Sequence, residues 1–344
     1  MSHYSPRQER LSNVCFDIVQ DEQGIFYFAT RNGVLQFDGR NWELIPSQGA
    51  IYSLQRSATN QQLYWAGVSG FGSISKSQDG TRMMNHLSPP GVRDVFESLI
   101  VKNRPYFLTE QSLLVYNKGA STEIKATDQT GLFTGVFELF ESVYVNTERD
   151  GVFKVENDSK LVRNLLAIPA DEEVVFSCVL NNYYLIGLSN NKVYLCGEDL
   201  KLREIVLEDQ TYIDASVVVT GSWINRDLFV LGTLRGGLIF VQTATGRTQE
   251  IINYNTGLPD NEVYALMTDK GQNIWTAHEY GFTRIAPYLP FRSFSHYPGI
   301  SGNLLCVHTF EKKVYVGTSL GLYALEKEEY YDEIIYYVDV EIPV

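Results

Sequence analysis

One unit recurs along the whole of this 344-residue chain, and the repetition limits the fold more than any other feature. Two copies are clear, at residues 13–45 and 257–285. In each copy an aspartate precedes an aromatic residue by six positions, and a glycine follows that aromatic residue after six more. These residues are Asp21, Tyr27 and Gly33 in the first copy, and Asp269, Trp275 and Gly281 in the second. A spacing shared by such distant segments indicates a repeat protein.

The same pattern gives eight units, which begin near residues 13, 50, 95, 133, 174, 213, 261 and 302. Each unit contains four short alternating segments, which in the fifth unit are "VVFSCVLN", "YYLIGLS", "KVYLCG" and "LREIVLE". No segment has the pattern of a long amphipathic helix. Four strands in a unit of about 40–45 residues predict an all-β fold, a β-propeller of four-stranded antiparallel blades.

A single four-stranded blade cannot bury both of its faces, whereas blades stacked around an axis cover one another and leave few free edges. A β-helix fits less well because its repeats are shorter, and tandem β-sandwiches would not keep one motif at a fixed offset. The repeats leave open whether the ring closes on seven or on eight blades. The aromatic residues ahead of the glycine turns are expected at equivalent strand positions: Tyr27, Trp65, Tyr144, Tyr184, Trp275 and Tyr315.

Three units carry a more specific pattern, roughly N-x-V-x-x-I-x-x-D-x-x-G-x-L-W-x-G-T-x-x-G-L. The first unit has Asn13, Cys15, Ile18, Asp21, Gly24, Phe26, Tyr27, Ala29, Thr30, Gly33 and Val34 in that register. The seventh has Leu258-Pro259 and then Asn261, Val263, Leu266, Asp269, Ile274, Trp275 and Gly281, with Gly271 one residue early and Ala277-His278 in place of G-T. The eighth has "VYVGTSLGLYAL". These residues resemble the repeat of two-component regulator propellers, the ligand-sensing modules of bacterial signalling proteins.

The resemblance implies a sensor that binds a small polar ligand, such as an oligosaccharide, and acts on downstream signalling domains or a sensor partner. Family sensors usually close on seven blades, often as two propellers in series. Two divisions of the chain follow. Residues 1–344 form a single propeller, which the tail "YYDEIIYYVDVEIPV" favours by supplying a fourth strand for unit eight, or residues 1–295 form a seven-bladed propeller and residues 296–344 begin a second. The chain is expected to be a piece of such a sensor or a separately encoded propeller.

Charge and hydropathy exclude some partners. The formal net charge of −13 repels phosphate backbones, so nucleic-acid binding is not expected. No run of about 18 apolar residues occurs, so this segment is expected to make no direct membrane contact. The N-terminus "MSHYSPRQER" has no apolar signal-peptide core. The protein is therefore either cytosolic or, as the resemblance implies, periplasmic or extracellular after removal of a signal.

The candidate ligand-binding residues lie in the loops between the second and third strands of the units. In a propeller these loops face the same end as the links between blades, so residues from different blades are expected around one mouth of the channel. Arginine offers a rigid donor fork for carboxylates or sulfates, and tyrosine offers a stacking face for a sugar ring. The alternative is that all are solvated turn residues. The candidates are Arg31, Glu110, Glu148, Arg149, Arg235, His278, Glu279 and Tyr280.

Signals for catalysis are weak. The five histidines are scattered and form no HExxH motif, and neither GxSxG nor a P-loop occurs, so we expect no metal site, no cofactor and no enzyme. The four cysteines, which form no CxxC motif, lie in apolar strand-like segments and are expected as free thiols. Two alternatives to a ligand sensor remain: a scaffold propeller that binds another protein, and a propeller glycoside hydrolase or lyase with converging acids.

Overall fold

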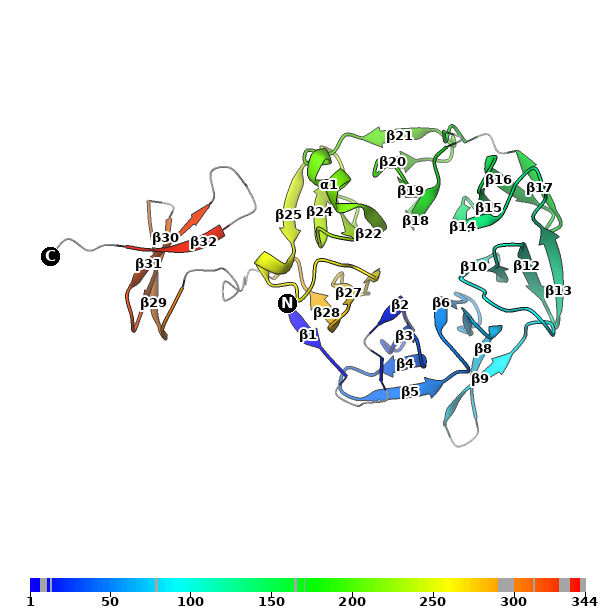
Figure 1. The fold of residues 1–344 in the computed structure, drawn as a ribbon, viewed down its shortest axis with the longest axis horizontal. Coiled ribbons are helices and arrows are strands. Elements are labelled where there is room, and N and C mark those ends of the chain that lie inside the picture. The colour runs from blue at the N-terminus through cyan, green and yellow to red at the C-terminus, as the bar shows by residue number, and fades with distance from the viewer. Residues whose placement is uncertain are drawn as a thin grey trace.

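The computed structural model describes residues 1–6, 11–12, 14–77, 80–163, 166–169, 171–289, 300–311, 313–327 and 335–340. Seven four-stranded antiparallel sheets form a ring, and an eighth lies outside it (Figure 1). The described ranges contain one short helix, α1 (Gln210–Ser216), and one 3-10 turn, η1 (Tyr254–Thr256). The predicted all-β propeller is therefore confirmed. No helix in these ranges is long and apolar enough to span a membrane.

Each of blades 1 to 6 consists of four consecutive strands. In blades 1 to 3 these are β2 (Cys15–Gln20), β3 (Phe26–Thr30), β4 (Gly33–Phe37), β5 (Trp42–Pro46), β6 (Ile51–Arg56), β7 (Leu63–Gly67), β8 (Gly70–Lys76), β9 (Arg82–His86), β10 (Glu97–Val101), β11 (Arg104–Leu108), β12 (Ser112–Asn117) and β13 (Ala120–Lys125). In blades 4 to 6 they are β14 (Phe133–Leu139), β15 (Ser142–Thr147), β16 (Gly151–Glu156), β17 (Lys160–Arg163), β18 (Val174–Leu180), β19 (Tyr183–Leu188), β20 (Val193–Cys196), β21 (Leu202–Ile205), β22 (Val218–Asn225), β23 (Leu228–Thr233), β24 (Leu238–Gln242) and β25 (Thr248–Ile252).

The N-terminal strand completes blade 7. This blade consists of β26 (Ala265–Thr268), β27 (Ile274–His278), β28 (Gly281–Ile285) and β1 (Ser2–Tyr4), with Tyr4 opposite Phe282 in an antiparallel pair. Blades 7 and 1 then share a core that contains Phe28, Trp275 and Phe282. The ring is thus closed by one strand from the start of the chain and three from near residue 280, which ties distant segments together.

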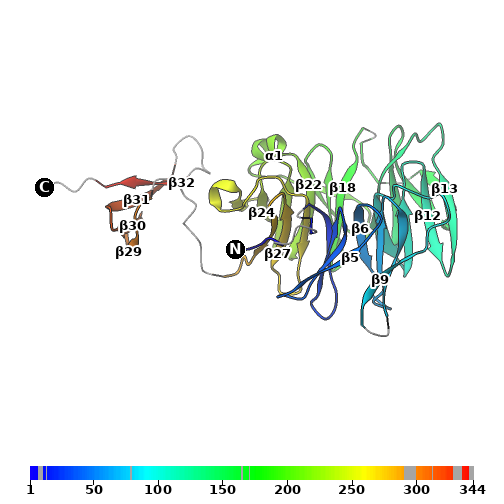
Figure 2. The same cartoon turned by 60° about the horizontal axis from the view of Figure 1, so that its bottom comes forward.

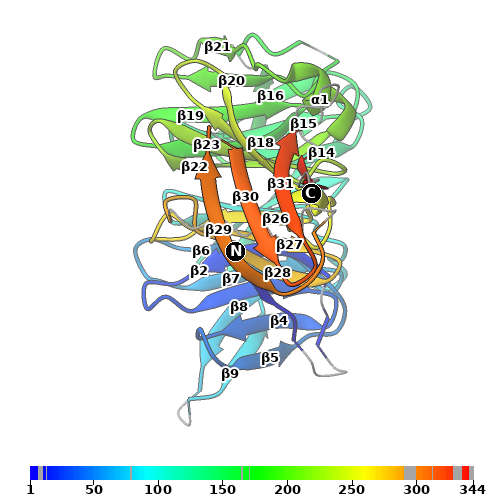
Figure 3. The ribbon, with the colours of Figure 1, turned by 90° about the vertical axis from the view of Figure 1, so that its left-hand side faces the viewer.

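The eighth sheet consists of β29 (Leu304–Phe310), β30 (Lys313–Thr318), β31 (Leu322–Lys327) and β32 (Ile335–Asp339), and these described strands pair only with one another. The side views show it beside the ring, with α1 at one end of the ring (Figure 2) and β29, β30 and β31 toward the viewer (Figure 3). The strand predicted in the tail corresponds to β32. Asn13 and residues 290–299, 328–334 and 341–344, which entered the sequence patterns, lie outside the described residues. The division into domains stays a prediction.

The six-residue spacing from aspartate to aromatic residue has a structural cause. Asp21 accepts two backbone N–H bonds through Oδ1 within the turn between β2 and β3, and its Oδ2 accepts from the Tyr27 hydroxyl at 3.0 Å. Asp269 holds the corresponding turn of blade 7 in the same way, and its Oδ2 accepts from Trp275 Nε1 at 3.1 Å. The repeated aspartate therefore holds both the backbone of the turn and the aromatic side chain that follows it.

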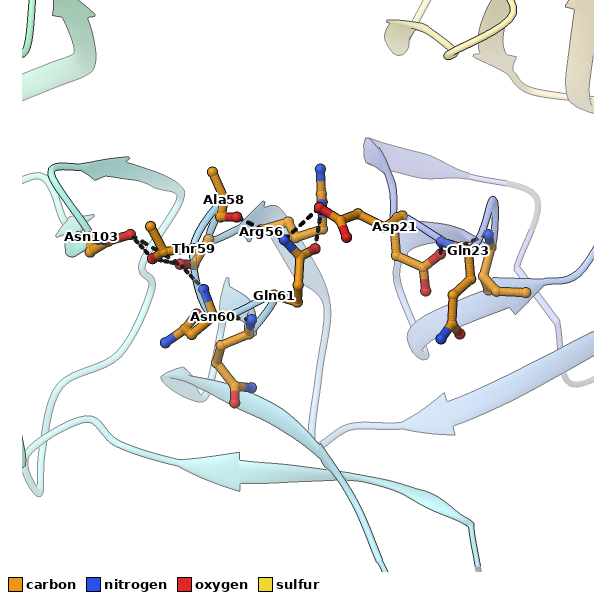
Figure 4. Close-up of polar contacts among 12 residues, drawn as sticks. Asp21, Gln23, Arg56, Ala58, Thr59, Asn60, Gln61 and Asn103 are labelled. Atoms are coloured by element: carbon orange, nitrogen blue, oxygen red, sulfur yellow. Dashed lines mark hydrogen bonds and ion pairs between the residues drawn. The ribbon is translucent and has the colours of Figure 1, made fainter.

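Polar contacts at the turns between first and second strands also join blades 1, 2 and 3 (Figure 4). Gln61 Nε2 donates to Glu22 Oε1 of blade 1 at 2.8 Å, and the Thr59 hydroxyl donates to Asn103 of blade 3. Arg56 Nη1 donates to Gln61 and lies 3.7 Å from Glu22 Oε1. These contacts are exposed, and such contacts contribute only about 0–1 kcal/mol each, so they orient the turns more than they hold the ring.

The expected alignment of aromatic residues is right at four positions and wrong at two. Tyr27, Tyr144, Trp275 and Tyr315 each lie three positions before the last residue of the second strand. Trp65 lies two positions before it and Tyr184 four, so both side chains point to the opposite face of their blades. In blade 2 the adjacent Tyr64 holds the equivalent position. In blade 5 the loop after β19 is longer, so counting residues back from the turn does not lead to the equivalent strand position.

The glycine turn gives a test of this architecture. Gly33 has a φ of +139°, and a Cβ there would lie 2.2 Å from the carbonyl oxygen of Ile45, whereas Gly39 has a φ of +97° and nothing within 4 Å of a Cβ. We expect Gly33→Ala to lower the free energy of unfolding by about 3 kcal/mol and Gly39→Ala by about 1 kcal/mol, as measured by urea denaturation. Equal losses would mean that close packing of the β4–β5 pair plays no part.

Candidate functional site

The loops between second and third strands lie at the end of the ring where one blade leads into the next. Their backbones bind these links directly: Glu148 N donates to Leu132 O at 2.9 Å, and Arg235 N donates to Ser216 O at 3.1 Å. Two predicted site residues thus have a structural role through their main chain, and their side chains are exposed at this end.

Most of the predicted site residues stand apart from one another. Glu148 Oε2 accepts from Leu132 N at 3.2 Å and lies 3.9 Å from Arg149 Nε, while Arg149 Nη1 donates to the carbonyl of Asp128 at 3.2 Å. These contacts stabilise the link that precedes β14. Neither of the two cavities described below is lined by the predicted arginines or glutamates. The exposed members of the set are Arg31, Glu110, Glu148, Arg149, Arg235, Glu279 and Tyr280.

Two predicted residues, His278 and Tyr280, share a cavity of about 320 Å³ where the closing strand meets blades 1 and 7. We call this cavity the seam pocket. No lysine, arginine, aspartate or glutamate is among its described lining residues, so its electrostatic character is set by two histidines and by aromatic rings. The lining residues are His3, Tyr4, Ser5, Trp42, Pro259, His278, Tyr280 and Phe282.

One histidine of the seam pocket, His278, is fixed in one tautomer. Tyr280 N donates to His278 Nδ1 at 3.2 Å, so the proton of the neutral ring is on Nε2, which donates to Thr283 Oγ1 at 2.7 Å. The same Thr283 hydroxyl lies 2.9 Å from His3 Nδ1 and so links the two histidines. Burial, and next the charge of His3, lower the pKa of His278 to about 4, so this ring is neutral at neutral pH. His278 was expected as an exposed loop residue and is instead buried at the end of β27.

The aromatic residues of the seam pocket divide into a packed floor and an open rim. Trp42 stacks on Phe37 at 4.2 Å and on Phe282 at 5.4 Å between ring centroids, so its ring is packed between residues of blades 1 and 7. Tyr4 stacks on Trp275 at 5.2 Å. Tyr280 is 61% exposed and presents a free ring face at the rim. The pocket therefore combines a rigid floor with one accessible aromatic side chain.

A second, larger cavity of about 480 Å³ was missed by the sequence analysis. It is lined chiefly by the innermost strands β2, β6, β10, β14, β18 and β22, and we call it the channel cavity. Its described lining residues include three carboxyl groups and no lysine, arginine or histidine. The only signal in the sequence is an acidic residue within an apolar run, as in "CFDIV" and "VFESLI". The acidic residues are Asp17, Glu97 and Glu138, and the aromatic ones are Phe16, Tyr52, Phe96, Phe137, Phe176 and Tyr184.

Two of these acids join neighbouring blades. Asp17 Oδ2 accepts from Leu54 N of blade 2 at 2.8 Å, and Glu97 Oε2 accepts from Val136 N of blade 4 at 2.8 Å. Both amides directly follow an irregularity in strand pairing, where a β-bulge interrupts the ladder. The carboxyl groups therefore bind backbone N–H groups that the sheet does not use, and they point along the wall of the channel cavity.

Inner-strand contacts continue around the ring. Ser53 and Ser98 join blades 2 and 3 through their hydroxyls at 2.8 Å. Ser177 donates to the carbonyl of Glu138 at 3.0 Å, which joins blades 5 and 4, and Trp223 Nε1 donates to the carbonyl of Cys178 at 3.1 Å, which joins blades 6 and 5. The wall of the cavity is thus built from hydrogen bonds between blades, and it forms a rigid surface.

Burial raises the pKa of two carboxyl groups in the channel cavity. It raises the pKa of Asp17 to about 6, although the N–H groups of Leu54 and Ile18 favour the charged form. It raises the pKa of Glu97 to about 7 against the N–H of Val136, and the charge of Asp17 adds to the rise. Desolvation of the carboxylate exceeds the hydrogen bonding in both cases. The two groups therefore titrate near neutral pH.

The sequence matches no protein-family model and no curated protein. Among solved structures, the chain is similar to the extracellular domain of a putative one-component system from B. thetaiotaomicron, at 14% identity and a TM-score of 0.64, over 96% of this chain and 46% of that one. It is also similar to the extracellular domain of a putative hybrid two-component system from the same organism, at 15% identity and a TM-score of 0.66, over 92% and 46%. This chain shares their β-propeller fold.

Streptogramin B lyase is similar as well, at 12% identity and a TM-score of 0.64, over 80% of this chain and 94% of that one. At such identities the likeness concerns the fold. The resemblance of the repeats to two-component regulator propellers is confirmed at that level. The chain spans less than half the length of the two extracellular domains, 46% in each case.

Proposed function

We propose that this chain is the ligand-sensing propeller of a bacterial signalling protein, located in the periplasm or outside the cell and acting without catalysis. The two solved extracellular domains belong to signalling systems, and they share its fold over more than nine-tenths of its length. Streptogramin B lyase shows that propellers also support enzymes, so the site and not the fold has to carry the argument.

The seam pocket is the observation that carries this proposal. Its described lining contains no lysine, arginine, aspartate or glutamate, and it offers the exposed ring of Tyr280 together with polar groups on His3 and Ser5. A small polar ligand with a flat apolar face and several hydroxyls fits this combination, and a neutral saccharide is the first candidate.

The position of the pocket suggests how binding is reported. A ligand held there would contact the closing strand β1, blade 1 through Trp42, and blade 7 through Tyr280. It would favour the arrangement in which all three are packed together, and so bias the way in which the propeller contacts its signalling partner.

We expect Tyr280→Ala to weaken the binding of a neutral oligosaccharide at least about tenfold, which corresponds to ~1.4 kcal/mol, because the stacking face is lost. Calorimetric titration of the full chain against a panel of neutral and acidic oligosaccharides measures this. The control is Tyr254→Ala, since Tyr254 is a similarly exposed tyrosine, at 65%, outside the pocket. A double variant, Arg31→Ala with Arg235→Ala, tests the arginines predicted from the sequence. If only that double variant loses the binding of acidic oligosaccharides, the ligand site lies in the loops between second and third strands and not in the seam pocket.

A second candidate function, a scaffold that binds another protein, is favoured by the eighth sheet. Its strand β29 exposes Leu304, Leu305, Val307 and Phe310, at 65%, 70%, 64% and 58%. Apolar side chains on the two faces of an inner blade strand are normally covered by the neighbouring blades. We propose that residues 296–344 are the first blade of a second propeller; a partner protein is the alternative cover. If no member of the panel binds the wild type, the scaffold function becomes the better proposal.

A further inference from the structure

The channel cavity has an unbalanced charge. Its ionisable lining groups are the carboxyls of Asp17, Glu97 and Glu138 and the hydroxyls of Tyr52 and Tyr184, and none of its described lining residues is basic. Tyr184 donates to Glu138 Oε1 at 2.8 Å and so already serves that carboxylate. Asp17 receives hydrogen bonds from the Ser53 hydroxyl and the Leu54 N–H, and Glu97 receives one from the Val136 N–H, but neither carboxyl forms an ion pair with a described residue. Buried charges are normally paired, so two carboxylates without a counter-charge favour a positively charged occupant.

Aromatic rings form much of the remaining wall. Phe16 and Tyr52 meet edge to face at 5.2 Å between centroids, on the same two strands as Asp17 and its partner Ser53. Phe96 precedes Glu97, and Phe137 precedes Glu138, so each acid has an aromatic neighbour along the cavity. Ring faces attract alkylammonium groups as well as apolar surface, and this attraction is strongest where water is excluded.

The geometry distinguishes an organic cation from a metal ion. Within the described ranges, no three histidine, cysteine, aspartate or glutamate side chains come close enough to hold one metal ion. A volume of about 480 Å³ is also far larger than a bare ion needs and falls within the range of small-molecule sites.

We propose that the channel cavity binds a compact organic cation, one carrying a quaternary or primary ammonium group, with the charge between Asp17 and Glu97 and the alkyl part against the aromatic wall. This site is distinct from the seam pocket and does not depend on the function proposed there. Since the pKa values of Asp17 and Glu97 are raised to about 6 and about 7, occupancy should be greatest above neutral pH and should fall as protons replace the cation.

The test uses choline chloride and butylammonium chloride as probes, each titrated into the full chain at constant ionic strength. The uncharged comparison is 3,3-dimethyl-1-butanol, which has the shape of choline without its charge. We expect at least one cation to bind at concentrations up to about 10 mM and the alcohol to bind about tenfold more weakly or not at all. Binding of that cation should weaken about tenfold between about pH 8 and about pH 5.5. No binding of either cation, equal binding of the alcohol, or binding independent of pH would overturn the proposal.

Variants locate the site. Glu97→Gln keeps an oxygen for the N–H of Val136 and removes one charge, and it should weaken binding of the cation about tenfold. Glu156→Gln makes the same change in net charge at an exposed position outside the cavity and should leave binding unchanged. Asp17→Asn is the second channel variant, and melting curves show which variants fold. If Glu97→Gln or Asp17→Asn folds and binds the cation as tightly as the wild type does, the assignment of the site is overturned. If neither variant folds, the comparison of choline with its uncharged analogue decides whether the cavity binds a cation.

Discussion

Replacement of Trp275 by alanine is expected to lower the free energy of unfolding by about 4 kcal/mol, among the largest effects of any single substitution in the ring. Trp275 is 3% exposed, and its ring lies 4.3 Å from that of Phe26 and 5.2 Å from that of Tyr4 between centroids. Its Nε1 donates to Asp269. One side chain therefore fills the core between blades 7 and 1, holds the closing strand and satisfies a buried carboxylate.

Urea denaturation measures the loss, and hydrogen exchange shows where it acts. Because Tyr4 loses its stacking partner, amides of β1 should exchange faster in Trp275→Ala than in the wild type. Trp275→Phe keeps much of the packing and removes the N–H donor, so it should lose less than Trp275→Ala, about 1–2 kcal/mol. An exposed control, Tyr254→Ala, should change stability by less than about 0.5 kcal/mol. A small loss in Trp275→Ala would mean that blades 7 and 1 are not held together by this core.

The repeat made the propeller predictable because the features that define a blade are local. Tyr27 donates a hydrogen bond to Asp21, and Trp275 donates one to Asp269. In each case the two partners are only six residues apart, so their spacing is visible in the sequence. The closing strand was not predictable in the same way. It contains only three residues, Ser2–Tyr4, which is too short to show a period, and its partner lies 280 residues away.

For the candidate site, the sequence predicted the exposure of a residue only where that residue lies in a tight turn. Tyr280 lies in the tight turn between β27 and β28 and is exposed, as its position indicated. His278 lies two residues earlier and is buried, because β27 extends to it and Thr283 binds its ring. In the sequence, Asp17 has the place of an ordinary polar residue in a strand of alternating polar and apolar residues. Its partner Leu54 is on the next blade, and a bulge that leaves no mark in the sequence exposes the amide it binds.

The second large effect concerns pH. The folded-state pKa values of Asp17 and Glu97, about 6 and about 7, lie above their ordinary values of 3.8 and 4.5. Between these limits the folded protein binds more protons than the unfolded chain, so the contribution of both groups to stability falls as the pH rises. For Glu97 the loss between about pH 5 and about pH 8 is ~2 kcal/mol. His278 has the opposite sign, because its lowered pKa costs stability as the pH falls below its ordinary value of 6.5.

A comparison of variants therefore isolates the carboxyl group better than the pH profile of the wild type alone. We expect Glu97→Gln to gain stability relative to the wild type by about 2 kcal/mol as the pH is raised from about 5 to about 8, because its amide cannot ionise. Glu156→Gln, exposed and outside the channel, should follow the wild type throughout. Urea denaturation at several pH values gives the three curves. If the curves of Glu97→Gln and the wild type are parallel, Glu97 titrates as an ordinary glutamate. Burial would then not disfavour the Glu97 carboxylate, and the pH dependence expected for cation binding would rest on Asp17 alone.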